Sequence, residues 1–222
     1  TAESNDRRER ALAAYAERYA DYGPTLASEC LAEEGVVVPR ETLRRWLAAA
    51  GLRPTKRAKR KHRTRRPRRE RFGELVQLDG SDHDWFEGRR KGATLMVAID
   101  DASGRIFARF FEEETLVAAQ ETFRGWCERH GLPLALYVDR AGIYRSDREP
   151  TAEEVSLGRR PETQFGRAMR ELDVELILAN SSQAKGPVER MNGTLQNRLV
   201  KALRRAGAST LENLTGRSVQ HV

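Results

Sequence analysis

Cysteine is scarce in this chain of 222 residues, which has only Cys30 and Cys127. Each lies in a helix-like pattern and the two form no Cys-x-x-Cys pair, so the sequence argues against a disulfide framework and against a zinc site. An apolar run of about 18 residues and a signal peptide are also absent, so we expect no membrane partner and a reducing cytoplasm as the compartment. The chain begins at Thr1 rather than Met and stops soon after a predicted helix, and we therefore expect a fragment of a longer protein.

Positive charge is concentrated in one part of the chain. The whole sequence has 40 Lys and Arg against 33 Asp and Glu, whereas residues 53–72, the basic segment, have 12 Lys or Arg and one acid, Glu70. Clustered cations release the counterions condensed on phosphates, which favours a nucleic-acid partner; a solvated linker without a partner is the alternative. We expect the segment to contact phosphates without choosing a sequence. Its candidate DNA-binding residues are Lys59, Arg60, Lys61, Arg65 and Arg66.

Residues 1–52 have the pattern of three short helices. Apolar positions recur at helical spacing over residues 7–22, 26–35 and 39–51, and glycine or Gly-Pro ends each run. Three short helices with tight breaks predict a helix-turn-helix unit, although any small helical bundle would show the same periodicity. In a helix-turn-helix unit the third helix would offer its polar side chains to the major groove of double-stranded DNA: Arg40, Thr42, Arg44 and Arg45.

From residue 73 the pattern changes to strands that later alternate with helices. The predicted strands are residues 73–79, 94–100, 105–112, 134–139 and 174–178. The predicted helices are residues 115–130, 161–172 and 184–206. Residues 140–161 are polar and irregular. Three antiparallel strands followed by β-α-β crossovers predict an α/β domain with a mixed five-stranded sheet and helices on both faces, over residues 73–207.

Three carboxylates lie at the edges of three separate predicted elements. Asp79 ends the first strand, Asp139 ends the fourth, and Glu189 lies in the first turn of the last helix. Each alone has an ordinary explanation as a turn former or a helix-dipole partner. Together, on elements that a mixed sheet brings to one place, they predict a site for two Mg²⁺ or Mn²⁺ ions and phosphoryl transfer.

Other polar residues near these elements receive different interpretations. The last helix presents a polar flank beside its apolar stripe, and we expect this flank to contact DNA through Lys185, Arg190, Asn192 and Gln196. Four further acids are interpreted as loop or turn residues: Asp82, Asp84, Asp100 and Asp101.

Over residues 40–206 the chain resembles the catalytic core of DDE transposases and retroviral integrases. The likeness lies in Gly-Glu-Leu-Val-Gln-Leu-Asp-Gly-Ser at 73–81, Ile-Asp-Asp-Ala-Ser-Gly-Arg at 99–105 and, most specifically, Lys-Gly-Pro-Val-Glu-Arg-Met-Asn at 185–192. Within that family it is most similar to the ISNCY-type insertion-sequence transposases of bacteria. The resemblance implies an RNase H-like fold, a metal-binding triad of Asp79, Asp139 and Glu189, and an upstream helix-turn-helix that binds the terminal repeats of the element. It also implies a homo-oligomer acting on paired DNA ends.

Two features depart from the family pattern. The spacing of 50 residues from Asp139 to Glu189 is longer than the common integrase spacing, and residues 208–222 have little pattern and look truncated. Despite these departures, the resemblance implies a bacterial, nucleoid-associated transposase that cleaves and transfers DNA strands. The alternatives are a truncated, non-catalytic DNA-binding remnant or regulator, and a general nuclease on the same fold.

Overall fold

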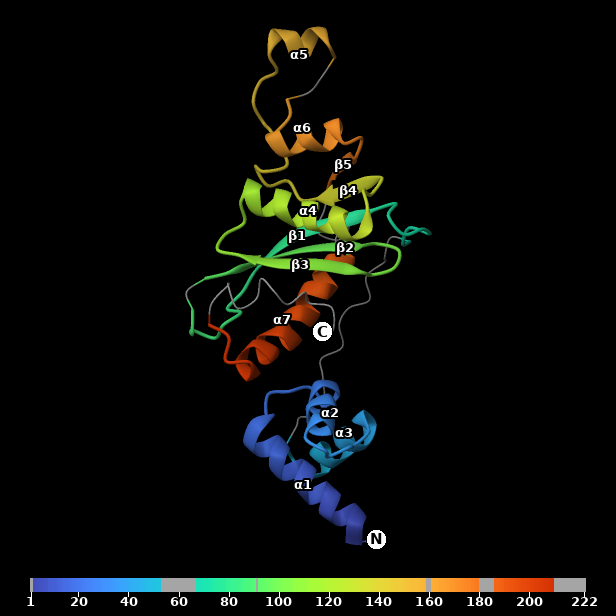
Figure 1. Ribbon diagram of the computed structural model, residues 1–222, viewed down its shortest axis with the longest axis vertical. Helices are drawn as coiled ribbons and strands as arrows, with labels where there is room; N and C mark the ends of the chain where they lie inside the picture. The colour runs from blue at the N-terminus through green and yellow to red at the C-terminus, as the bar shows by residue number, and fades with distance from the viewer. Residues whose placement is uncertain (1, 53–66, 91, 159–160, 180–185, 210–222) are drawn as a thin grey trace. The chain divides into compact units, whose positions relative to one another are not determined.

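The computed structural model describes residues 2–52, 67–90, 92–158, 161–179 and 186–209 (Figure 1). The chain divides into two compact units, Thr1–Arg63 and Thr64–Val222. Within the described ranges no helix combines the length and the apolar character that crossing a membrane requires. Most of the basic segment and nearly all of residues 208–222 lie outside these ranges.

The first unit consists of three helices around an apolar core, as the sequence predicted. α1 (Ala2–Arg18) begins earlier than the apolar pattern indicated, because its first turns are polar and carry no periodic signal. α2 (Pro24–Glu33) starts with a proline, whose fixed φ suits the first helical position, and α3 (Arg40–Ala49) follows. The core joins aromatic residues of α1 and its end to aliphatic residues of α2 and α3: Tyr15, Tyr19, Tyr22, Leu31, Leu43 and Leu47.

The second unit is built on a five-stranded sheet with the order β3-β2-β1-β4-β5. β1 (Val76–Asp82), β2 (Thr94–Asp100) and β3 (Ile106–Phe111) are antiparallel neighbours. β4 (Ala135–Val138) is parallel to β1, and β5 (Glu175–Leu178) is parallel to β4. This mixed topology confirms the RNase H-like fold that the sequence predicted.

Helices cover both faces of the sheet (Figure 1). On one face, α4 (Leu116–His130) packs against β2 and β3, and α6 (Gln164–Glu171) packs against β5, in a core that also includes Val76 and Leu78 of β1. On the other face, α7 (Gly186–Arg205) places Leu195 and Leu199 against Leu95 of β2. Alternation along the strands divides the core in this way, because successive side chains point to opposite faces. The polar alternate positions of β1 therefore face α7.

The structure corrects the predicted end of the first strand. β1 continues to Asp82, so Asp79 lies within the strand rather than at its end, and Asp82 is a strand residue rather than a loop residue. The reason is the pairing with β2, which runs without interruption from Val76↔Asp100 to Asp82↔Thr94. Sequence alternation weakens after Leu78, whereas the backbone hydrogen bonds to a fully buried neighbour continue.

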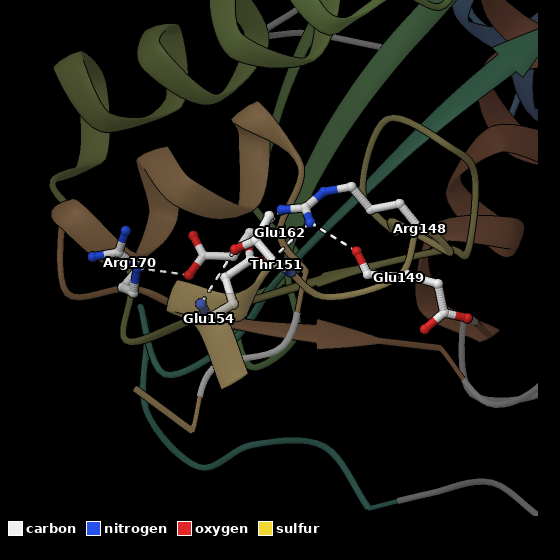
Figure 2. Close-up of polar contacts among 6 residues, drawn as sticks. All are labelled: Arg148, Glu149, Thr151, Glu154, Glu162 and Arg170. Carbon is white, nitrogen blue, oxygen red and sulfur yellow. Dashed lines mark hydrogen bonds and ion pairs between the residues drawn. The ribbon is translucent and has the colours of Figure 1, made fainter. Parts of the chain in front are cut away.

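The stretch predicted as irregular also contains a short helix, α5 (Ala152–Ser156). Thr151 and Glu154 form a reciprocal capping box at its start, and Arg148 holds the carboxylate of Glu154 (Figure 2). The hydrogen bond from Arg148 is the largest cause that lowers the pKa of Glu154, to about 2. A helix this short has little propensity of its own, so capping rather than apolar periodicity explains it. In the same view Arg170 of α6 pairs with Glu162.

Candidate active site

Asp79 lies on β1, and Asp139 directly follows β4, the parallel neighbour of β1. β1 and β4 pair with Val76 opposite Leu136 and Gln77 opposite Tyr137. The same offset continued by two residues brings Asp79 opposite Asp139, the residue that follows β4. Both residues are half-buried, and the Asp139 carboxylate accepts a hydrogen bond of 2.8 Å from the backbone N–H of Ala141, which fixes the turn after the strand.

A ladder of hydrogen bonds joins the α7 face of β1 to α7. The Val188 N–H donates to Oε1 of Gln77 (3.3 Å), the Asn192 amide donates to Asp79 (3.0 Å), and the Gln196 amide donates to the Ser81 hydroxyl (3.1 Å). Residues two apart on the strand thus meet residues four apart on the helix. The spacings agree, since two strand residues rise about 6.7 Å and four helical residues about 6 Å. α7 is therefore held along β1 in one register beside Asp79.

Glu189 is placed by this ladder but does not complete a metal site. It is exposed and lies in the first turn of α7, directly after Val188. In the part of the chain that the structure describes, no group of three His, Cys, Asp or Glu side chains could hold a metal ion. The structure thus brings Asp79 and Asp139 together and leaves Glu189 outside that pair.

The donor atoms at this place suit a hard divalent cation. Carboxylate and amide oxygens are the ligands that Mg²⁺ and Mn²⁺ take in proteins. Beside Asp79, the buried Oδ1 of Asn192 finds no hydrogen-bond partner among the described residues. A buried carbonyl-type oxygen without a donor is costly unless a ligand satisfies it. The residues present therefore fit a magnesium-type ion at the Asp79–Asp139 pair.

Two residues near Asp79 and Asp139 were not predicted from the sequence: Glu114 and Tyr144. Glu114, just before α4, lies so close to Gly80 that a side-chain Cβ at position 80 would overlap its carboxylate. The buried Tyr144 donates a long hydrogen bond of 3.5 Å to Glu114. Burial is the largest cause that raises the pKa of Tyr144, and the charges of Glu114, Asp139 and Asp79 raise it further. The glycine directly after Asp79 was the only sequence signal of this close approach.

The predicted DNA-binding residues have varied surroundings. On α3, Arg40, Arg44 and Arg45 are exposed and Thr42 is half-buried. Arg44 pairs with Glu41 at 2.6 Å, and this hydrogen bond is the largest cause that lowers the pKa of Glu41.

On α7 the predicted polar flank is only partly exposed. Arg190 is exposed, Gln196 is half-buried, and Asn192 is buried against Asp79. The other predicted DNA-binding residues lie outside the described ranges: Lys59, Arg60, Lys61, Arg65, Arg66 and Lys185.

Comparisons with known proteins agree with this fold. No protein-family profile matches the chain. A Sinorhizobium fredii protein assigned as a transposase, y4bF, is 47% identical over 208 residues, which is 93% of this chain and 44% of that protein. The transposase for insertion sequence IS1202 of Streptococcus pneumoniae is 39% identical over 150 residues, 66% of this chain and 31% of that protein. The chain thus spans less than half the length of either relative.

A comparison with solved structures finds a similar fold in one chain of a viral assembly. A chain of the simian T-cell lymphotropic virus intasome, solved in complex with PP2A regulatory subunit B56 gamma, matches with a TM-score of 0.52 and 18% identity. The match covers 84% of this chain and 60% of that chain. By sequence the protein is similar to bacterial transposases over part of their length, and its second unit has the RNase H-like fold.

Proposed function

We propose that the chain is the DNA-binding and catalytic part of a DDE-type transposase, which cleaves DNA at the ends of an insertion element and joins the freed ends to target DNA. The observation that carries the proposal is the offset between the parallel strands β1 and β4, which brings Asp79 opposite Asp139 when it is continued by two residues, next to the helix that bears Glu189. The sequence relationship to transposases supports the same reaction.

Asp79, Asp139 and Glu189 are the proposed ligands of two Mg²⁺ or Mn²⁺ ions. When bound, such ions lower the pKa of an attacking water or hydroxyl and neutralise charge on the phosphate. The protein supplies two carboxylates on rigid strands, a turn fixed by the Ala141 N–H, and the Asn192 amide that orients Asp79. The reaction is phosphoryl transfer without a covalent protein intermediate: water frees a 3′-hydroxyl, which then attacks target DNA.

Glu189 can reach the pair without movement of α7 as a whole. It lies three residues before Asn192, and residues three apart on a helix have Cβ atoms about 5–6 Å apart. Asn192 already contacts Asp79, so a change of rotamer in an exposed side chain carries the Glu189 carboxylate towards the same oxygen atoms. Positive charge bound between the carboxylates would favour this inward rotamer.

The residues before the catalytic unit are proposed to bind DNA. Residues 1–52 would bind the terminal repeats of the element through the exposed arginines of α3, and residues 53–72 would contact phosphates of the duplex. Residues 73–207 would carry the chemistry. We propose a homo-oligomer on paired DNA ends, associated with the bacterial nucleoid.

Nicking of supercoiled plasmid with Mg²⁺ or Mn²⁺ tests the proposal. We expect metal-dependent nicking by the native chain, and loss of nicking in Glu189→Gln and Asp139→Asn with unchanged plasmid binding. The matched control is Glu175→Gln, an exposed carboxylate at the start of β5, which should nick normally. Loss of binding together with nicking in the two site variants would count against their assignment as metal ligands.

A non-catalytic DNA-binding remnant is the second candidate. The observation in its favour is that Glu189 does not join Asp79 and Asp139 in a metal-holding group within the described residues. Plasmid binding without nicking at any concentration of Mg²⁺ or Mn²⁺, in the native chain, would establish this candidate instead.

A further inference from the structure

A series of hydrogen bonds, partly buried at its first link and buried at the next two, runs from the end of the basic segment to the first turn of α7. The backbone N–H of Arg69 donates to Oδ2 of Asp101 (2.7 Å), and the Gln77 amide donates to Oδ1 of the same carboxylate (2.9 Å). Oε1 of Gln77 then accepts from the Val188 N–H (3.3 Å). The side chains of Gln77 and Asp101 are both buried, at 0% and 1% exposure. Buried polar groups are expensive to leave unpaired, so the links act together.

Each side chain in this series of hydrogen bonds has the donor and acceptor groups that its two neighbours require. An ionised carboxylate only accepts, so Asp101 can satisfy two donors, whereas an amide donates and accepts, so Gln77 can join an acceptor to a donor. The Val188 N–H belongs to the first turn of α7, whose N–H groups have no partner within the helix. Gln77 therefore caps α7 from inside the sheet, one residue before Glu189.

The first turn of α7 is held both by the fully buried Val188 side chain and by the hydrogen bond from its N–H to Gln77. A cavity of about 140 Å³ lies between the β2–β3 turn and α7, and its lining includes Arg68, Asp101 and Arg190. On α7 the cavity borders Arg190 and Thr194, beyond the first turn.

The other end of this series of hydrogen bonds is held against the sheet by Phe72 and Gly73, next to exposed arginines. The Gly73 N–H donates to Asp100 at 2.9 Å, and the Phe72 ring lies 6.0 Å from that of Trp126. Three arginines directly before Phe72 and Gly73 are exposed: Arg68, Arg69 and Arg71. A phosphate bound by these arginines would therefore act on a backbone that is already bonded to Asp101.

We propose that Gln77 is a positioning residue that couples DNA bound at residues 68–71 to the placement of Glu189. DNA that holds the Arg69 backbone strengthens its bond to Asp101, which keeps the Gln77 amide directed at α7 and the first turn of α7 formed. The inference rests on the proposed function only in giving Glu189 its catalytic use; the coupling itself concerns DNA and the α7 turn.

Isosteric substitutions test each link. Gln77→Glu keeps the acceptor for the Val188 N–H but places a carboxylate against Asp101, which breaks the middle link. Asp101→Asn leaves one of its two donors, Gln77 or Arg69, without an acceptor. The double variant Gln77→Glu/Asp101→Asn reverses the direction of the middle bond and restores all three links with no change in net charge. Gln120→Glu, on the exposed face of α4, is the matched control.

The first readout is hydrogen exchange of the first turn of α7, with and without a short random-sequence DNA duplex at low salt. In the native chain and the control, we expect DNA to slow exchange of the Val188 amide by about tenfold or more. Each single variant should lose this DNA effect while it still binds the duplex, and the double variant should regain it. If Gln77→Glu is unfolded by circular dichroism, Asp101→Asn and the double variant still decide the question.

The second readout is the nicking rate, which should fall by about a hundredfold in the single variants, as expected for a misplaced catalytic group, and recover in the double variant. No DNA effect on the Val188 amide in the native chain would overturn the coupling, as would an undiminished effect in the single variants. If the native chain fails to nick but shows the exchange pattern, the proposed function fails and the coupling stands.

Discussion

Removing the charge of Asp139 should make the second unit more stable when no divalent metal is present. Continued by two residues past Gln77 and Tyr137, the offset of the parallel strands β1 and β4 puts Asp79 opposite Asp139, and neighbouring strands lie about 4.8 Å apart. Two unit charges at that distance repel by about 3.5 kcal/mol at an effective dielectric constant near 20. Both side chains are half-buried, so water and salt screen part of this repulsion, and we expect about 1–2 kcal/mol in practice.

The substitution Asp139→Asn isolates this charge effect. Its amide oxygen can still accept the 2.8 Å hydrogen bond from the Ala141 N–H, so the turn after β4 keeps its support. The unfolding temperature of the second unit should then rise by about 2–8 °C in EDTA. In the native chain Mg²⁺ should raise the unfolding temperature, because the cation binds between the two carboxylates, and this increase should largely disappear in the variant.

Thermal unfolding followed by circular dichroism, in EDTA and in Mg²⁺, measures both effects. Asp173→Asn is the control, since Asp173 is an exposed aspartate in a turn with φ of 56°, a conformation that asparagine tolerates. The reasoning is refuted if Asp139→Asn unfolds at or below the native temperature in EDTA, or if Mg²⁺ stabilises it as much as it stabilises the native chain.

Three further outcomes are expected. Gly125→Ala should lower the free energy of unfolding by about 1–3 kcal/mol, measured in urea, because the added Cβ overlaps the ring of Phe107; no change would mean that the ring moves freely. Asn192→Ala should weaken Mg²⁺ binding by about 10–100-fold in calorimetry, because it removes the hydrogen bond to Asp79; equal affinities would exclude this role. Burial and neighbouring arginines lower the pKa of His130, so the unfolded chain binds more protons. Stability should therefore fall as the pH drops from about 7 through 6.5 towards 5, and His130→Gln should show a smaller fall.

The strands and helices were largely predictable because their signals are local. Apolar runs separated by a turn predicted β2 and β3 to within a residue, and helical spacing predicted α4 and α7. The position of Asp79 opposite Asp139 could not be read from either strand, because the pairing offset joins segments 60 residues apart. The α5 helix was missed because capping holds it, and its apolar positions show no period.

Buried polar residues were the least predictable part of the candidate site. Asp100 and Asp101 were interpreted as turn residues, and Ser103 does bond Asp100 as a turn would require. Their burial depends on Gly73 and Arg69, distant in sequence, which donate to the same carboxylates. Gln77, between two apolar residues of β1, carries no local sign that it joins the sheet to α7.

The ladder between β1 and α7 also limits how the two elements can move. A shift of α7 by one residue would rotate its side chains by about 100° and break all the links at once. The next arrangement that again presents a suitable face lies about 6 Å away, one helical turn along the strand. Two strand residues also rise a fraction of an ångström more than four helical residues. In a longer ladder this difference would add up until the paired side chains no longer met. The contact thus allows one position or a full-turn jump, and small adjustments near Glu189 must come from side-chain rotation or from unwinding of the first turn.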